Sequence, residues 1–220
     1  MENGLNIESN NQLFNIKRFL SFQKLNRELL QTVADKVQLE MNYIDIENLI
    51  LENFKVHQID SSWHPIKVRI DTDTLLSFSQ KSDPEIKIKQ NSIFFIDIGT
   101  VKDGLEGDVV ETFVFGDDFK KTLLIKKCKT VFDETIKAWK VENLTGPELY
   151  KFAQQKSLEL NVELNLKMDG HRVGSFPHGV YFKGGLMDIE ISPSPNLWIL
   201  EIQIKCPMLN LGAFYEDLIQ

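Results

Sequence analysis

The sequence predicts an α+β fold built from two halves that share one order of elements. In each half, amphipathic helical segments come first and extended segments follow, which segregates the helices from antiparallel strands. The order of two helices and then strands returns at an offset of roughly 100 residues, with negligible identity between the halves. We therefore expect two pseudo-symmetric halves in one domain, residues 12–220, after a flexible N-terminus at residues 1–11.

The first half begins with two predicted helices. Apolar residues recur at helical spacing over residues 12–38, and a second, shorter helix covers residues 44–54. Runs of β-branched and aromatic residues follow and predict strands. These strands lie at residues 66–70, 74–79, 92–98 and 108–115.

The second half repeats this order. Residues 119–141 are helical in pattern, and Gly146-Pro147 starts another helix that runs to residue 159. Four extended segments complete the half. They lie at residues 162–167, 179–183, 197–204 and 213–219.

The segment IFFIDIGTVKDGLEGDVVETFVFG predicts a β-hairpin with a two-residue loop at Asp103-Gly104. If Lys102 faces Leu105, Gly99 faces Asp108 and Asp97 faces Val110, so both aspartates lie on one face as diagonal neighbours. Like charges this close favour a proton or a cation between them. Two alternatives stay open, namely a local turn and solvent role for each aspartate, and a bulge at Gly107 that would send them to opposite faces.

Two glutamates occupy matching places in the second half. Glu201 follows Asp97 by 104 residues, and Glu216 follows Asp108 by 108 residues. An exposed edge strand for Glu201 and a surface position for Glu216 are the alternatives. Four carboxylates in register between two halves favour a shared site.

Composition narrows the classes of function. The chain has 220 residues and a net charge of -7, which argues against nucleic acid as a partner because phosphate binding needs a basic surface. Its two cysteines lie in no paired motif, so the sequence suggests neither a disulfide nor a cysteine-zinc site. It has no apolar run of the roughly 20 residues that span a bilayer and no signal-peptide pattern. We expect a cytoplasmic protein without a membrane partner, and the sequence does not indicate an oligomeric state.

His171 and His178 lie among glycines in MDGHRVGSFPHGVYFKGG. With IDIG, GDVVETF, LEIQI and YEDLI, this segment resembles the motifs of the pita-bread metallopeptidases, which include methionine aminopeptidase, aminopeptidase P and prolidase. The resemblance covers residues 12–220. It implies a pita-bread fold, in which two pseudo-symmetric halves surround a curved antiparallel sheet, and a catalytic centre with two divalent metal ions.

The resemblance also implies a role for each ligand. Asp97 would bind one metal in bidentate fashion, Asp108 and Glu216 would bridge the two metals, and His171 and Glu201 would complete the shell of the second metal. A metal-bridged hydroxide would be the nucleophile. An oxygen-rich shell with one imidazole suits Mn(II), Fe(II) or Co(II), and Zn(II) is also among the ions that such a shell accepts.

Two catalytic residues follow from the same resemblance. Glu201 would carry the proton of the water to the leaving amine, and His178 would donate a hydrogen bond to the scissile carbonyl. The family's further substrate histidine is missing before the first aspartate strand. His64 is the candidate to replace it, and the alternative is an ordinary loop histidine. Thr112 is the candidate to orient the nucleophile, and the alternative is an ordinary strand threonine.

Other positions depart from the family pattern. Glu111, Arg172 and Gly179 replace residues around the ligands, and Lys167 replaces a histidine of the prolidase-type enzymes. We therefore expect an aminopeptidase-like dimetal hydrolase of a peptide or small amide, without prolyl specificity. A catalytically inactive pita-bread binding module and a creatinase-like hydrolase of small amides are the alternatives.

Overall fold

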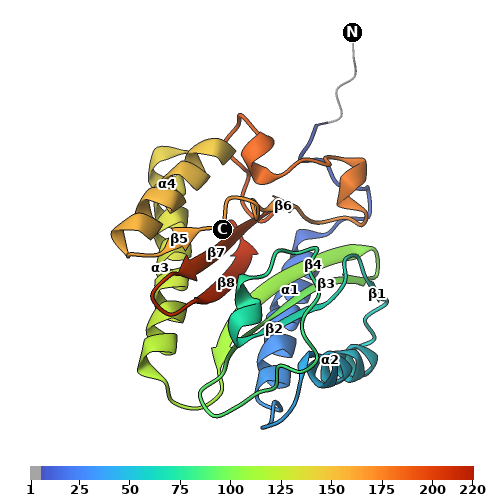
Figure 1. The fold of residues 1–220 in the computed structure, drawn as a ribbon. Helices are drawn as coiled ribbons and strands as arrows, with labels where there is room; N and C mark the ends of the chain where they lie inside the picture. The colour runs from blue at the N-terminus through green and yellow to red at the C-terminus, as the bar shows by residue number, and fades with distance from the viewer. Residues whose placement is uncertain (1–5) are drawn as a thin grey trace.

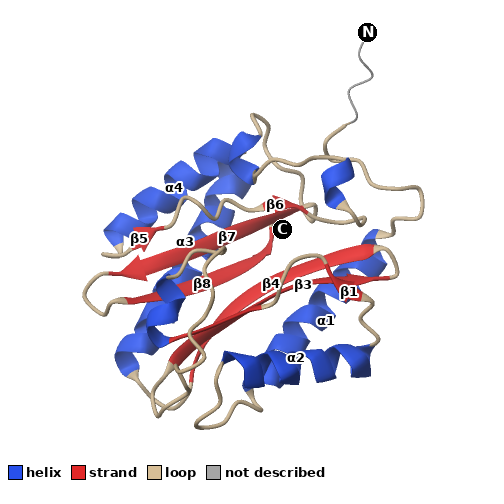
Figure 2. Cartoon of the chain, turned by 45° about the vertical axis from the view of Figure 1, so that its right-hand side comes forward, coloured by secondary structure: helices blue, strands red, loops and turns tan. Residues whose placement is uncertain are grey.

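The computed structural model describes residues 6–220 and confirms the α+β class (Figure 1). A single antiparallel sheet runs through both halves in the order β1-β3-β4-β8-β7-β5, with β2 also paired to β3 and β6 to β7. Figure 2 shows helices α1 and α2 beside β3 and β4, and α3 and α4 beside β7 and β8. None of the helices in the described residues is long and apolar enough to cross a membrane.

The helices of the first half begin at asparagine caps. The Asn15 side chain accepts from the backbone N–H of Arg18 and starts α1 (Ile16–Ala34), which is shorter at both ends than predicted. Asn42 and Asp45 form a capping box at the start of α2 (Tyr43–His57). Two short strands, β1 (Ser61–Ser62) and β2 (Lys67–Ile70), then pair with the same neighbour, β3.

The predicted strand at residues 74–79 is wrong, because the chain turns into a 3₁₀ helix, η1 (Asp71–Leu75). Asp71 has a φ of 49°, which ends β2 after Ile70. Its carboxylate accepts from the Ser92 hydroxyl at 2.7 Å and from the Ile93 N–H at 3.0 Å. These bonds hold the chain reversal against the start of β3, so the apolar residues that follow are not in a strand.

The hairpin register predicted from the sequence is confirmed. In β3 (Ile93–Lys102) and β4 (Leu105–Val114), Gly99 pairs with Asp108 and Asp97 with Val110. Gly107 pairs with Thr100, so the alternative with a bulge is wrong. The other face of the hairpin packs on α1 and α2, and Glu111 of this face pairs with Arg27 at 3.0 Å.

The second half has the predicted helices, α3 (Phe119–Glu142) and α4 (Gly146–Glu159). Its sheet is formed by β5 (Glu163–Leu164), β6 (His171–Arg172), β7 (Trp198–Cys206) and β8 (Leu211–Leu218). The extended segment predicted at residues 179–183 is wrong. A 3₁₀ turn, η2 (His178–Val180), starts there, and a second one, η3 (Leu186–Asp188), follows it.

The segment before α1 contacts the second half. Glu8 accepts from the Ser194 hydroxyl at 2.6 Å and from Trp198 Nε1 at 2.7 Å, and the buried Arg172 guanidinium donates to the carbonyls of Ile7 and Ser9. Residues 1–5 of the predicted flexible N-terminus lie outside the described residues. Its flexibility stays a prediction.

Candidate metal centre

The four predicted carboxylates come from four adjacent central strands. Asp97 of β3 pairs with Val110 of β4, Val110 pairs with Glu216 of β8, and Glu216 pairs with Glu201 of β7. Directly paired residues share a face, and Asp108 shares the face of Val110 because it lies two residues away. The apolar face of each strand pair packs on the helices, so all four carboxylates lie on the opposite face. Each is at most 8% exposed.

The four carboxylates form a row across the sheet, and two histidines approach this row, one on either side of Asp108. His171 Nε2 lies 2.7 Å from Asp108 Oδ2 and 3.9 Å from Glu201 Oε1. His64 Nε2 lies 3.3 Å from Asp108 Oδ1 and 3.4 Å from Asp97 Oδ1. The structure therefore brings His64 to the carboxylates themselves, although the sequence suggested it only as a substrate contact.

His178 is held beside the row by Glu106. Its Nδ1 lies 2.8 Å from Glu106 Oε2, and its backbone N–H donates to Glu106 Oε1 at 3.1 Å. The ring stacks on His171 with centroids 5.2 Å apart. Sequence reasoning missed Glu106. It precedes Asp108 by two residues, so strand alternation places both side chains on the same face. Glu106 is thus the carboxylate partner of His178.

A cavity of about 210 Å³ opens over the row. Its apolar walls are Trp63, Phe78 and Met168. The Trp63 indole meets the edges of three imidazole rings, with centroids 4.5 Å from His64 and 5.0 Å from both His171 and His178. Trp63 is therefore part of the wall of the candidate site.

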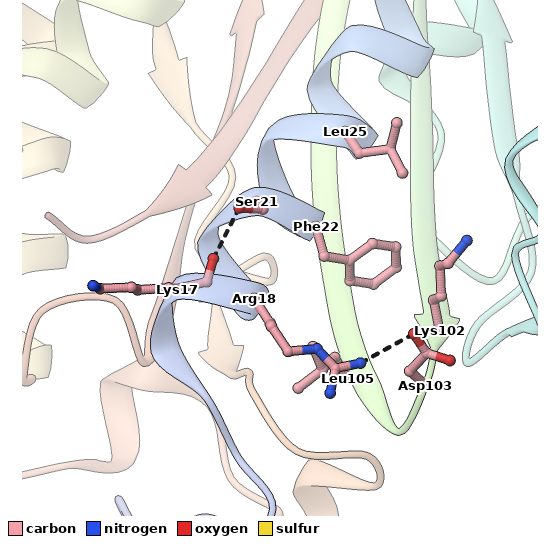
Figure 3. Close-up of a pocket in the computed structure, with 8 residues that line it drawn as sticks. All are labelled: Lys17, Arg18, Ser21, Phe22, Leu25, Lys102, Asp103 and Leu105. Carbon is pink, nitrogen blue, oxygen red and sulfur yellow. Dashed lines mark hydrogen bonds and ion pairs between the residues drawn. The ribbon is translucent and has the colours of Figure 1, made fainter.

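A larger hollow lies elsewhere on the surface. It measures about 380 Å³ and lies between α1 and the β3–β4 loop, where Arg18 reaches Asp103 at 3.1 Å (Figure 3). None of the predicted site residues lines it. The convergence of charged groups, and not the size of the hollow, therefore identifies the candidate site.

Comparison with known proteins decides the family. A sequence model of metallopeptidase family M24 matches residues 18–199, which is most of the chain. The chain belongs to metallopeptidase family M24. No match was found among curated protein sequences.

Solved structures of family M24 enzymes share the fold. Methionine aminopeptidase from Thermotoga maritima matches with a TM-score of 0.70 and 16% identity over 92% of this chain and 91% of that chain. Prolidase from Pyrococcus horikoshii OT3 matches with a TM-score of 0.74 and 15% identity over 95% of this chain and 59% of that chain. X-Pro aminopeptidase from Thermotoga maritima MSB8 matches with a TM-score of 0.72 and 11% identity over 94% of this chain and 58% of that chain. At these identities the likeness shows the fold alone, and the pita-bread prediction is confirmed.

Family M24 is a family of metallopeptidases, and the carboxylates and imidazoles of the row are suited to bind a metal ion. Carboxylate and imidazole groups are the ligands that Mn(II), Fe(II), Co(II) and Zn(II) accept. Within residues 6–220, the buried atoms Glu201 Oε2 and Glu216 Oε1 have no hydrogen-bond partner. A buried carboxylate oxygen without a donor is costly, and a cation in the row would satisfy both atoms.

The electrostatics differ along the row of this M24 chain. Burial raises the pKa of Glu201 to about 8 and that of Asp97 to about 7, and burial with the charges of Asp108 and Glu201 raises the pKa of Glu216 well above its usual value. Burial alone would also raise the pKa of Asp108. Hydrogen bonds from His171 and His64 outweigh it, so that pKa is lowered.

Both histidines of the row have raised pKa values. Burial alone would lower the pKa of His64 and His171, yet the adjacent aspartates raise them to about 10 and about 9. In the metal-free cluster, these pKa shifts favour the protonated forms of His64, His171, Glu201 and Glu216. Metal binding has to displace such protons.

Thr112 does not line the cavity. Its hydroxyl donates to the Phe214 carbonyl and accepts from the Phe214 N–H, both at 2.8 Å. This side chain joins β4 to β8, and its suggested contact with the nucleophile stays a prediction.

Proposed function

We propose that this M24 chain is an aminopeptidase-like, dimetal-dependent hydrolase of peptide or small amide bonds. The observation that supports the proposal is the convergence of Asp97, Asp108, His171, Glu201 and Glu216 at one cavity, with carboxylate oxygens that lack partners among the described residues. These five side chains would hold the two ions. The predicted cytoplasmic location belongs to the same proposal.

The chemistry divides between the ions and the chain. When bound, divalent metals lower the pKa of water and polarise a carbonyl, which makes hydrolysis feasible near neutral pH. Glu201 would accept a proton through Oε2, which has no other partner in residues 6–220, and return it to a leaving amine.

His178 would stabilise charge on the substrate carbonyl oxygen. Glu106 accepts the Nδ1 proton of His178 and balances the charge of the ring when both nitrogens are protonated. In that form, Nε2–H can donate to an oxygen as negative charge develops on it. Glu106 also binds the backbone N–H of His178, so it positions both the ring and the turn that carries it.

The cavity favours a small substrate with an apolar group. Trp63, Phe78 and Met168 form its walls, and its volume of about 210 Å³ is below the usual range for drug-sized ligands. Removal of a terminal residue from a peptide and hydrolysis of a small amide both suit such a space. The creatinase-like alternative therefore stays in competition with the aminopeptidase. Trp63 and His64, packed over the row, favour the inactive binding module as the remaining alternative.

The test combines metal binding with turnover. Mn(II) is titrated into metal-stripped protein by calorimetry, beside Asp108→Asn and the exposed control Asp133→Asn. We expect about two ions to bind the wild type and the control, and binding to be lost in Asp108→Asn. Loaded protein is then assayed on dipeptides, acylated amines and cyclic amides. Metal binding without any turnover would favour the binding module, and no binding by folded wild type would reject the dimetal proposal.

A further inference from the structure

His64 lies where a metal ligand would lie, and the distances are those of donors that share an ion. Its Nε2 is 3.3 Å from Asp108 Oδ1 and 3.4 Å from Asp97 Oδ1. Two donors bound at about 2.1 Å to one divalent ion, at angles of about 90–109°, lie about 3.0–3.4 Å apart. These three side chains offer ligand atoms that all lie within 4.8 Å of one another.

The hydrogen bonds of His64 match those of His171. His64 Nδ1 lies 2.9 Å from the carbonyl oxygen of Pro65, and His171 Nδ1 lies 2.7 Å from that of Arg172. In each case, a carbonyl of the next residue takes the Nδ1–H, which leaves Nε2 free to offer a lone pair. Metal-binding histidines characteristically donate the other ring N–H in this way. His178 differs, since its Nδ1 bonds to Glu106.

Gly99 makes the close approach of His64 to the row feasible. A Cβ at this position would lie 2.2 Å from His64 Cδ2 and 2.3 Å from His64 Nε2. The backbone of Gly99 is ordinary extended strand, so its missing side chain matters for space and not for conformation. Strand β3 therefore presents Asp97 and, two residues later, the gap that admits the imidazole.

We propose that His64 is a sixth protein ligand of the metal centre, binding through Nε2 the ion that Asp97 and Asp108 hold. The inference rests on the proposed function. Each ion would then have one imidazole, His64 on the Asp97 side and His171 on the Glu201 side. Since His64 occupies a coordination position, open positions for substrate would lie mainly on the Glu201 side.

Co(II) titration of metal-stripped, full-length protein tests the assignment. Affinity is measured by calorimetry, and ligating imidazoles are counted by NMR as paramagnetically shifted N–H signals, which the Nδ1 hydrogen bonds keep from rapid exchange. We expect two shifted imidazole signals in the wild type. His64→Ala should lose one of them and weaken one Co(II) site by at least about tenfold, and by less for Mn(II), which prefers oxygen ligands.

Two further variants make the result specific. His57→Ala removes the one histidine that lies away from the cavity and should change neither the NMR signals nor the Co(II) affinity. Gly99→Ala keeps His64 but displaces its ring, so it should lose the same signal as His64→Ala. If His64→Ala fails to fold, Gly99→Ala alone decides, and circular dichroism reports the fold of each.

Several outcomes would overturn the assignment. Two signals and unchanged affinity in folded His64→Ala would mean that His64 is not a ligand, while the dimetal proposal would stand. Tighter Co(II) binding in that variant would make His64 an obstruction of the site. Absence of Co(II) binding in the wild type would instead reject the proposed function itself.

Discussion

The two halves of the sheet have the same topology, but Asp108 of the first half and the two glutamates of the second half are in opposite electrostatic situations. In the first half, Asp108 accepts from both His64 and His171, and its pKa is lowered. In the second half, one oxygen each of Glu201 and Glu216 has no partner among residues 6–220, and both pKa values are raised. Positive charge is therefore supplied at Asp108 and missing at the glutamates, which is where an added cation is most needed.

The largest expected effect separates Asp108 from Glu216. In metal-free protein at pH 7, Asp108→Asn should lower the free energy of unfolding by about 3–5 kcal/mol, because two histidines lose their buried counter-charge. Glu216→Gln should change it by less than about 1 kcal/mol, because burial raises the pKa of Glu216 and disfavours its charged form, and the neutral Gln side chain has nearly the same shape. Urea unfolding in EDTA measures both, with Asp133→Asn as the exposed control. Equal losses in the two variants would contradict the comparison.

The pH dependence of the metal-free protein sharpens the same contrast. The folded state keeps protons that the unfolded state releases, since the pKa is raised from 3.8 to about 7 for Asp97, from 4.5 to about 8 for Glu201, and from 6.5 to about 9 and about 10 for His171 and His64. Their stabilisation is complete below the unfolded pKa and is lost as the pH rises through the folded one.

The free energy of unfolding in EDTA should therefore fall between about pH 4 and pH 10, most steeply where the four titrations overlap near pH 7. The lowered pKa of Asp108 has the opposite sign and acts only in acid. Thermal unfolding across this range checks the trend. A metal-free stability that rises from pH 6 to pH 9 would refute it.

A smaller effect is expected on His178, which stands outside the row. Glu106→Gln removes the carboxylate that orients the ring, so kcat of the metal-loaded enzyme should fall by about tenfold while the metal affinity stays the same. Glu111→Gln is the control on the same strand, because its side chain faces α1. A loss of metal binding in Glu106→Gln would show that Glu106 supports the ligands instead of His178.

The smallest expected effect lies at the junction of the halves. Thr112→Val leaves the buried Phe214 N–H and carbonyl without their hydroxyl partner and should lower the free energy of unfolding by about 1–2 kcal/mol. Thr112→Ser retains the hydroxyl and should lose less. Urea unfolding compares the two variants. Equal losses would show that the methyl group, and not the hydrogen bonds, stabilises this position.

Much of the fold and of the carboxylate row was predictable from local pattern. Alternation with period two, counted from the Asp103-Gly104 turn, predicts the observed hairpin register and the shared face of Asp97 and Asp108. The repeated order of elements predicts Glu201 and Glu216 at matching places. The strand predicted at residues 74–79 failed because the hydrogen bonds of Asp71 to Ser92 and Ile93 reverse the chain, and these bonds join residues more than 20 positions apart.

The sequence by itself determined the residue types of the site, their faces on the strands and the pairing of the hairpin, because these depend on a repeat of two residues and on a short turn. Only the tertiary structure decided that His64 meets Asp97 and Asp108 and that Glu106 holds His178. His64 and His178 lie outside the long strands and have no repeat to count. Packing decides their positions, since His64 fits over Gly99 and His178 starts a turn bound to Glu106.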